Sequence, residues 1–372
     1  MGTIYITGGR CWADNSFRPN TGLTRETNQN WDRELRLTEE DMILPGVIDM
    51  HAHVWTPYAS KKLGIPVDRT YYKGVVAAAD AGSFGCSTWH KSNQFLMDTA
   101  NQKVKLFMHV LPVGLTGFPL RNFTQVESVD LDRVIETAKQ DRSGNLLGFK
   151  IHLGLIDAGH DQKLLAAARK CADGVGKAIE VHVSGAQAPF EMIAEYLRPG
   201  DVVAHAFSGR RDPILDERGA VRACVRDAVS RGVHLDVAHA GKHFSWRVFR
   251  QARDDGILFD FVGTDSTMNN YENEARQMLD IFHIASALMN AGVDETHVIQ
   301  AITTNPARFI DYHLDIERQT LVLQRVSRTI PFYDDASEGL KDYIIGDHEY
   351  VPVLFLDGNR VIYDSLDHTP AL

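Results

Sequence analysis

The sequence has no long hydrophobic run and no excess of positive charge. No apolar stretch approaches the ~20 residues that a membrane-spanning helix needs. The chain has 39 lysines and arginines against 49 aspartates and glutamates, so its net charge is −10 and nothing in it attracts nucleic acid or an anionic membrane. The first residues, MGTIYITGGRCW, lack the basic and apolar regions of a secretory signal. We therefore expect a cytoplasmic protein that binds neither nucleic acid nor membrane.

Cysteine is also scarce, and no two cysteines are close in the sequence. A zinc motif or a redox motif needs a CxxC pair, and a disulfide framework needs a denser set of cysteines. We expect reduced thiols that pack into the structure, as is usual in the cytoplasm. The four cysteines are Cys11, Cys86, Cys171 and Cys224.

From residue 44 onward one unit recurs, namely an apolar run, a polar or glycine tip and a helical stretch. Near-continuous apolar runs are typical of parallel strands that are buried on both faces. Eight such units predict an α/β fold, the (β/α)8 TIM barrel. A doubly wound open sheet is the alternative, but it usually has a glycine-rich phosphate turn where this chain has His-Ala-His. The runs are 46–53, 74–82, 104–111, 146–153, 178–185, 201–209, 232–241 and 258–266.

The two ends of the chain have a different pattern, with short alternating runs. The C-terminal YVPVLFLDGNRVIYD contains the Asp-Gly pair of a tight hairpin. We predict a small β domain from residues 1–43 plus 312–372, and a barrel over residues 44–311. Near the end of the barrel, TTNPARFIDY predicts a helix with Asn305 as N-cap and Pro306 in the first helical position.

Ionisable side chains follow the carboxyl ends of several predicted strands, where a barrel of this kind has its active site. His51 and His53 are two residues apart, so a strand places both on one face. Each histidine alone could be a packed core residue. A whole cluster is costly to bury unless its members are paired or bind a metal, so the cluster predicts a metal centre. The tip residues are His51, His53, Lys150, His182, His205 and Asp265.

Lys150 is the unusual member of this set. An ammonium group repels a metal ion, but a neutral amine near cations can react with carbon dioxide. The resulting carbamate is anionic and has two oxygens, so it could bridge two metals. The alternative is a lysine that forms an ion pair inside the barrel.

The set resembles the binuclear, carboxylated-lysine subtype of the amidohydrolase superfamily, and its dihydroorotase-like deacetylase branch. The motifs DMHAH, GFKIH, EVHVSG, VAHAFSG and GTDS agree with that family in order and in strand. The resemblance implies that His51, His53 and Asp265 bind one metal ion. It implies that His182 and His205 bind a second. Zinc is the expected occupant, although the donors also suit manganese, iron or cobalt.

The resemblance further implies that Lys150 is N6-carboxylated and bridges the two metals. Two positions depart from the family pattern. Dihydroorotases carry an arginine where this chain has Trp55, and carbamate-bridged relatives often have an arginine where it has His152. The first departure argues against dihydroorotase activity.

The implied function is a binuclear metal-dependent hydrolase, an amidohydrolase or deacetylase acting on C–N bonds other than peptide bonds, or on esters. A hydroxide that bridges the metals would be the nucleophile, and Asp265 would carry its proton to the leaving group. A net positive centre favours a small, carboxylate-bearing substrate, such as an N-acyl amino acid or an acylated hydroxy acid. The alternatives are a cyclic-amide hydrolase of the dihydroorotase or hydantoinase type, a mononuclear deaminase, or a non-catalytic scaffold, which the complete ligand set argues against.

Other polar residues near the strand tips suggest supporting roles. His152 and His239 are candidates for substrate contact. Asp49 and Glu180 share strand parity with His51 and His182, so they could orient those ligands. We expect His243, on the loop after the seventh run, to be solvated. The sequence leaves open whether the protein forms a homo-oligomer.

Overall fold

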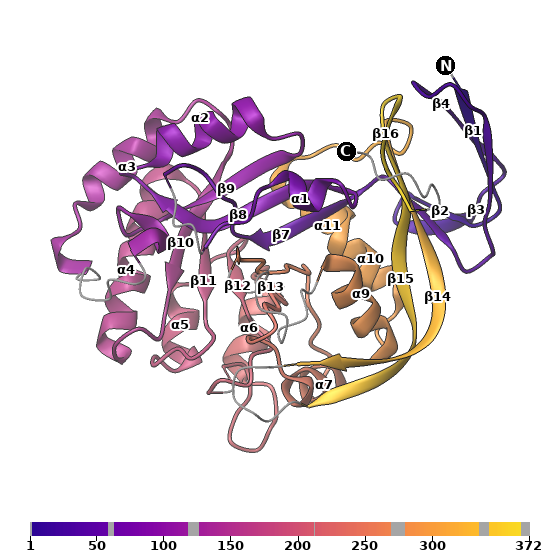
Figure 1. Ribbon diagram of the computed structural model, residues 1–372. Helices are drawn as coiled ribbons and strands as arrows, with labels where there is room; N and C mark the ends of the chain where they lie inside the picture. The colour runs from indigo at the N-terminus through magenta and orange to yellow at the C-terminus, as the bar shows by residue number, and fades with distance from the viewer. Residues whose placement is uncertain are drawn as a thin grey trace.

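A curved sheet of seven parallel strands forms the centre of the molecule (Figure 1). The computed structural model describes residues 2–58, 63–117, 126–211, 213–268, 280–334 and 342–365. Successive strands are neighbours in the sheet, as right-handed βα units require. In sequence order the strands are β7 (Val47–Ala52), β8 (Val75–Gly85), β9 (Lys103–His109), β10 (Leu146–His152), β11 (Ala178–His182), β12 (Val202–Ala204) and β13 (His234–Asp236).

The eighth predicted run is not a regular strand, yet it closes the sheet into a barrel. Phe261 forms a parallel bridge to Asp236 at the end of β13. Ser266 forms a parallel bridge to Ala52 in β7. Residues 260–266, called the closing segment below, therefore join the last strand to the first. The predicted barrel is confirmed, although one of its eight strands was expected to be longer and more regular.

Two local features shape the closing segment. A Cβ atom at Gly263 would lie 2.3 Å from Cβ of His51, so only glycine fits there. Asp265 has a left-handed backbone with φ of 50°, which an extended strand cannot contain. Its N–H still donates to the His51 carbonyl at 2.6 Å, so the segment stays attached to β7.

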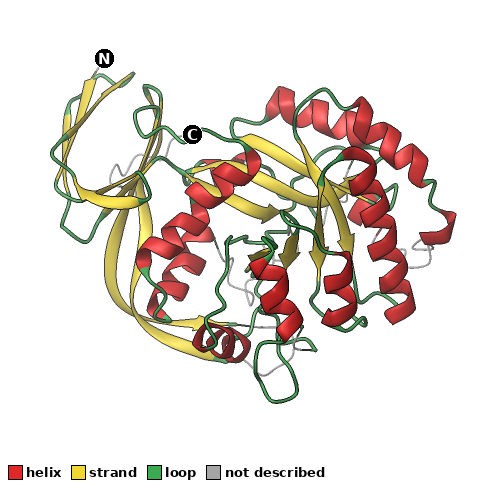
Figure 2. Cartoon of the chain, turned by 180° about the vertical axis from the view of Figure 1, so that it is seen from behind, coloured by secondary structure: helices red, strands yellow, loops and turns green. Residues whose placement is uncertain are grey.

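Helices cover the outer face of the barrel, as the view from behind shows (Figure 2). The longest, α4, begins where the Asp157 side chain accepts from the His160 N–H and ends at Gly176 in a left-handed conformation. The helices are α1 (Asp68–Tyr71), α2 (Trp89–Thr99), α3 (Leu131–Gln140), α4 (Ala158–Val175), α5 (Phe190–Tyr196), α6 (Ala223–Ser230), α7 (Trp246–Asp254), α9 (Ile281–Asn290), α10 (Glu295–Ile302) and α11 (Thr304–Ile310). Within the described ranges, every helix is too short or too polar to cross a lipid bilayer.

The start of α11 differs from the prediction. Thr303 is its N-cap, and the helix begins at Thr304, so Pro306 is the third helical residue. The predicted N-cap, Asn305, instead donates from its side chain to the Asp260 carbonyl at 3.2 Å. This contact fastens the helix to the closing segment.

Strands from both ends of the chain share a six-stranded sheet, in the order β16-β15-β14-β6-β2-β3. Leu321 of β14 pairs with Leu44 of β6, and Asp357 pairs with Arg360 across the predicted Asp-Gly hairpin. The exact domain boundaries stay a prediction. The strands are β2 (Arg10–Ala13), β3 (Ser16–Pro19), β6 (Met42–Leu44), β14 (Gln319–Tyr333), β15 (Tyr343–Asp357) and β16 (Arg360–Asp364), and a three-stranded sheet adds β1 (Gly2–Thr7), β4 (Leu23–Thr27) and β5 (Arg33–Arg36).

The long hairpin of β14 and β15 reaches past α9 and α10 as far as α7 (Figure 1). Trp246 of α7 donates from Nε1 to the Phe332 carbonyl of β14 at 2.8 Å. A small apolar core, which includes Ile4, Ile43 and Val322, holds the terminal sheets together beside the large barrel core. The hairpin therefore fixes the C-terminal helices against the barrel.

Candidate metal centre

One group of buried metal donors lies where the closing segment meets β7. His51, His53 and Asp265 each present a donor atom, and these atoms lie within 4.8 Å of one another. Asp265 Oδ1 is 3.0 Å from His53 Nε2 and 3.7 Å from His51 Nε2. His51 Nε2 is buried and has no hydrogen-bond partner. Two imidazoles and a carboxylate in this arrangement suit zinc or a similar divalent ion.

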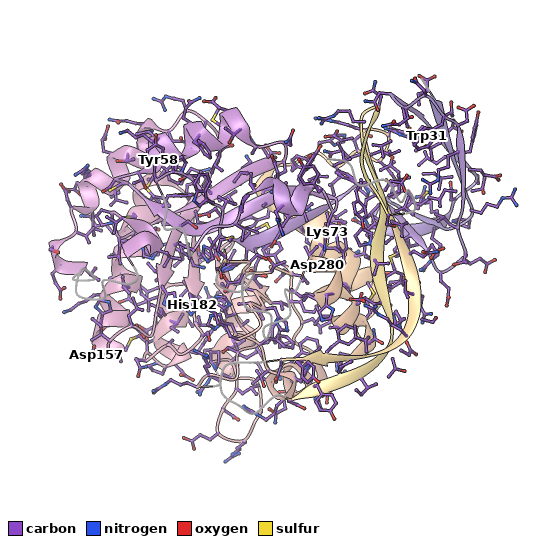
Figure 3. The ribbon with its side chains drawn as sticks, in the orientation of Figure 1. Trp31, Tyr58, Lys73, Asp157, His182 and Asp280 are labelled. Carbon is purple, nitrogen blue, oxygen red and sulfur yellow. The ribbon has the colours of Figure 1, made fainter. Side chains whose placement is uncertain are left out.

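A second group of donors consists of three imidazoles. His182 at the end of β11, His205 after β12 and His243 after β13 present nitrogen atoms within 4.8 Å of one another. Figure 3 marks His182 among the carboxyl ends of the barrel strands. The ring centroids of His51 and His205 are 4.9 Å apart, so the two groups are adjacent. The donor set therefore fits two metal ions side by side.

The second nitrogen of each ring in the first group lies near a side-chain oxygen. His53 Nδ1 is 3.0 Å from the Ser83 hydroxyl. His51 Nδ1 is 2.9 Å from Glu180 Oε1 and 3.4 Å from Asp236 Oδ2. Metal-binding histidines have the same feature, because such a contact fixes the ring and leaves the other nitrogen for the ion.

Two rings of the second group are anchored in the same way. His182 Nε2 is 3.1 Å from the Ser184 carbonyl, and His205 Nδ1 is 2.7 Å from the Ala238 carbonyl. The N–H must donate in both cases, since a carbonyl only accepts. Nδ1 of His182 and Nε2 of His205 are therefore the atoms left for an ion.

The charge states of most of these groups match metal binding. Burial and Lys150 lower the pKa of His51, but the carboxylates of Glu180 and Asp236 raise it more, to about 9, so an ion bound there must displace a proton. Burial lowers the pKa of His182, His205 and His243 well below the usual value for histidine, so all three are neutral and keep a lone pair. Burial raises the pKa of Asp265, but its contacts with His53 and His51 lower it more, and the carboxylate stays ionised. Neutral imidazole and ionised carboxylate are the forms that bind divalent ions.

Strained backbone occurs at two of the donors. His205 has a φ of 62° and Asp265 a φ of 50°, which non-glycine residues rarely adopt. Such strain persists only where the surrounding structure enforces it, and it is common at functional sites.

Lys150 belongs to neither donor group but is near both. Burial and the charge of Lys150 lower the pKa of His205, and both oppose the carboxylates that raise the pKa of His51. Nζ lies 2.6 Å from Glu180 Oε1, and the side chain is 1 % exposed. A Cβ at Gly82 would lie 2.5 Å from Cγ of Lys150, so that glycine leaves the space that the lysine occupies.

Asp49 and Glu180 both contact His51, one of the ligands that they were predicted to orient, and Asp49 does so by accepting from the His51 N–H at 3.2 Å. Glu180 contacts the ring of His51 rather than that of His182. Asp49 accepts from the Thr264 hydroxyl at 2.6 Å and from the Thr264 N–H at 3.0 Å. Asp49 thus holds the closing segment that carries Asp265, and it does not contact a histidine ring.

The two predicted substrate contacts lie in different surroundings. His152 stacks on His182, with ring centroids 3.6 Å apart and an interplanar angle of 18°. The ring of His239 stacks on Phe244 at 4.7 Å, among aromatic side chains of the α7 region. His239 belongs to neither donor group. A role in substrate binding stays a prediction for both.

His243 was expected to be solvated, and this expectation is wrong. The side chain is 8 % exposed and belongs to the second donor group. Ala238 and Ala240 have φ of 39° and 54°, and Gly241 has 65°, so the loop turns back over the barrel end. The only sequence signal was a histidine after the glycine in AHAGKH, and it does not predict this turn.

Sequence reasoning also missed two buried groups at strand ends. Asp236, at the end of β13, contacts His51. His109, at the end of β9, is 1 % exposed, and burial lowers its pKa to about 3. Both follow apolar runs, so the rule that found the other tip residues could have found them.

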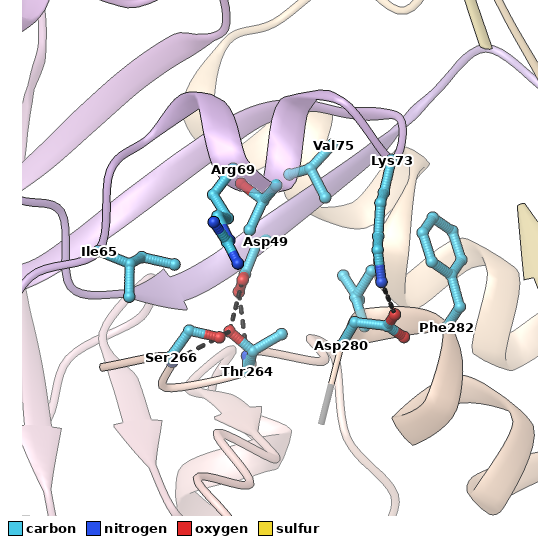
Figure 4. A pocket seen from close by; sticks show the side chains of 11 residues that line it. Asp49, Ile65, Arg69, Lys73, Val75, Thr264, Ser266, Asp280 and Phe282 are labelled. Carbon is cyan, nitrogen blue, oxygen red and sulfur yellow. Dashed lines mark hydrogen bonds and ion pairs between the residues drawn. The ribbon is translucent and has the colours of Figure 1, made fainter. Parts of the chain in front are cut away.

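A cavity of about 220 Å³ lies between α1, the closing segment and the start of α9 (Figure 4). Lys73 Nζ and Asp280 Oδ2 form an ion pair of 2.9 Å at one side of it. Asp49 and Thr264 line the opposite side. The cavity is thus next to the residues that hold the closing segment in place.

No family model matches the chain. A deacetylase of Agrobacterium fabrum is 26 % identical over 291 residues, which are 77 % of this chain and 70 % of that protein. A deacetylase of Brucella anthropi is 27 % identical over the same shares of the two chains.

Solved structures share the fold over nearly the whole chain. A dihydroorotase matches with a TM-score of 0.76 at 21 % identity, covering 97 % of this chain and 98 % of that one. An adenine deaminase matches with a TM-score of 0.79 at 18 % identity, covering 97 % and 99 %. The chain therefore shares its fold with a dihydroorotase and an adenine deaminase, and its sequence is similar to those of proteins named deacetylases.

Proposed function

We propose that the protein cleaves an amide or ester bond of a small anionic substrate with two divalent metal ions, zinc in the first instance. The substrate would be an N-acyl amino acid or an acylated hydroxy acid. The observation that carries the proposal is the presence of two adjacent, buried donor groups at the carboxyl ends of the barrel strands. The sequence relatives named deacetylases support the removal of an acyl group.

In this proposal His51, His53 and Asp265 hold the first ion. His182 and His205 hold the second. Lys150, near both groups, would be N6-carboxylated, and its carbamate would supply anionic oxygen ligands to both ions. Bound ions would supply a water activated near neutral pH and would polarise the substrate carbonyl.

Asp265 is the proposed proton carrier. Its Oδ1 atom faces His53 at 3.0 Å, and its Oδ2 atom faces His243 of the second group at 4.0 Å. The carboxylate therefore lies between the two groups, where Oδ2 could accept a proton. It would then pass this proton to the leaving nitrogen or oxygen.

Charges near the second group favour an anionic substrate. Two divalent ions carry +4, and the carbamate and Asp265 carry −1 each, which leaves a net +2. Arg210 and Lys242 are close enough to His243 to lower its pKa, beside the larger effect of burial. A carboxylate next to the scissile bond would be attracted to this end of the site.

The alternatives are less well supported. A mononuclear deaminase needs one ion, whereas the chain offers two donor groups. Cyclic-amide hydrolysis of the dihydroorotase type needs a cation for the substrate carboxylate, but Trp55 stands where those enzymes have arginine. The Trp55 ring packs on Phe95 at 5.8 Å and offers no charge.

A substrate screen tests the proposal. Zinc-loaded and manganese-loaded protein would be assayed with N-acyl amino acids, acylated hydroxy acids, cyclic amides and aminopurines. We expect turnover of a compound in the first two classes and loss of this turnover after chelation. Turnover restricted to aminopurines, or turnover that survives complete metal removal, would contradict the proposal.

A further inference from the structure

His243 has the features of a metal ligand that the proposed function leaves without a role. The side chain is buried, and its ring centroid is 4.5 Å from that of His205 and 5.0 Å from that of His182. The three donor nitrogens lie within 4.8 Å of one another. Three neutral imidazoles gain little from facing each other in a buried space, whereas a cation among them would bind all three lone pairs.

One residue anchors two of the three rings. The Ser184 carbonyl accepts from His182 Nε2 at 3.1 Å, and the Ser184 hydroxyl is 2.8 Å from His243 Nδ1. The same hydroxyl is 2.8 Å from the hydroxyl of Ser208, so it can donate there while it accepts from His243. Ser184 therefore orients both rings toward the same space, as the residues behind metal ligands do.

The remaining nitrogen of His243 faces the centre. Nε2 lies 4.0 Å from Asp265 Oδ2, the side chain that joins the first donor group to the second. The loop that carries His243 contains Ala238 and Ala240 in left-handed conformations, which are costly for residues with a Cβ. This loop geometry buries the imidazole of His243 at the carboxyl end of the barrel instead of leaving it in solvent.

We propose that His243 is the third nitrogen ligand of the second metal ion. With His182 and His205 it forms a three-histidine subsite, and three protein ligands with one open position make a stable catalytic zinc site. The second ion then stays bound when Lys150 carries no carbamate. This inference rests on the proposed two-metal function, but it assigns a ligand which that proposal lacks.

Zinc binding tests the assignment without any substrate. Metal-free protein would be titrated with zinc against a chromophoric chelator, for the wild type and for His182→Ala, His243→Ala and His243→Gln. His243→Gln keeps most of the side-chain volume and a donor for Ser184, so it separates ligand loss from misfolding. His90→Ala is the control, because it removes an exposed imidazole outside the centre.

We expect both His243 variants to bind the second zinc at least about tenfold more weakly, as His182→Ala does, with the first zinc unchanged. A repeat in carbon dioxide-free buffer should leave the second ion on the wild type and remove it from His243→Ala. The assignment is wrong if His243→Gln, folded by circular dichroism, binds both ions like the wild type. Fewer than two ions on the wild type would instead contradict the proposed two-metal function.

Discussion

Lys150 of β10 and Glu180 of β11 form a buried ion pair inside the barrel, with Nζ 2.6 Å from Oε1 and both side chains 1 % exposed. Burial raises the pKa of Glu180, but Lys150 and His51 lower it to about 2. Glu180 thus links the lysine to the first donor group. A carbamate forms only on a neutral amine, so carboxylation of Lys150 requires that the proton leaves this pair.

Carboxylation can be detected by its carbon atom. Protein loaded with zinc in isotopically labelled bicarbonate should give a carbamate carbon resonance, because bound cations favour the anionic carbamate over the ammonium. Lys150→Met removes the amine that is proposed to carry the carbamate and should remove the signal. A zinc-loaded wild type without this resonance would show that Lys150 is not modified.

The ion pair should contribute strongly to the stability of the metal-free protein. Glu180→Gln leaves a buried ammonium without its partner, and we expect a loss of about 3–5 kcal/mol in the free energy of unfolding. The double variant Lys150→Met with Glu180→Gln has no buried charge at these two positions. We therefore expect it to recover much of the free energy of unfolding that Glu180→Gln loses. Urea unfolding measures the stability of both variants. A Glu180→Gln variant as stable as the wild type would contradict the ion pair.

Asp265 should be essential for turnover. Asp265→Asn keeps the shape of the side chain but cannot accept a proton, so we expect turnover to fall by about 10²–10⁴-fold. Zinc content must be measured on the same sample, because Asp265 is also a proposed ligand. Asp254→Asn, at an exposed position in α7, is the control. Near-normal turnover of a zinc-loaded Asp265→Asn variant would exclude the proton role.

The contact between Thr264 and Asp49 should hold the closing segment. Thr264→Val removes the hydroxyl that donates to Asp49 at 2.6 Å and leaves a buried carboxylate with fewer donors. We expect a loss of about 1–3 kcal/mol in the free energy of unfolding. Thr264→Ser retains the hydroxyl and should lose less. If Thr264→Val and Thr264→Ser lose the same free energy of unfolding, the loss comes from packing and not from the hydroxyl.

A pH-dependent contact ties the C-terminal hairpin to the barrel. Glu349 of β15 lies 2.9 Å from His283 Nδ1 of α9 and also pairs with Arg328. The His283 hydrogen bond lowers the pKa of Glu349 against the opposing effect of burial. A lowered pKa means that the stabilisation is complete above the unfolded value of about 4.3 and is lost as pH falls through the folded value.

Glu349→Gln should therefore destabilise the protein at neutral pH by about 1–3 kcal/mol. The difference from the wild type should shrink well below about pH 4, where the carboxyl is protonated in both states. Urea unfolding at a series of pH values measures this. A difference that stays constant across the series would mean that the charge of Glu349 is not involved.

The donors on regular strands could be predicted from the sequence. His51 and His53 have the two-residue spacing of a strand, and His182 ends an apolar run. Parallel strands of a barrel bring such ends together whatever the loops do. Lys150 was found by the same rule, and so could His109 have been.

His205 and Asp265 were also predicted, although their backbone is left-handed, but other contacts could not be placed in this way. The position of His243 depends on left-handed residues at Ala238 and Ala240, which local sequence does not favour. The contacts of Asp49 with Thr264 depend on how the closing segment meets β7, where Gly263 allows a close approach. Such positions are set by packing between distant segments rather than by periodicity.

The metal content of the protein tests the central claim most directly. Purified protein would be stripped with a chelator, loaded with zinc, passed through a desalting column and analysed for zinc per chain. The two donor groups predict two tightly bound zinc ions per chain, and one in a protein that lacks His51 and His53. A wild-type chain that retains no zinc, or a single ion that survives the loss of both histidines, would contradict the account.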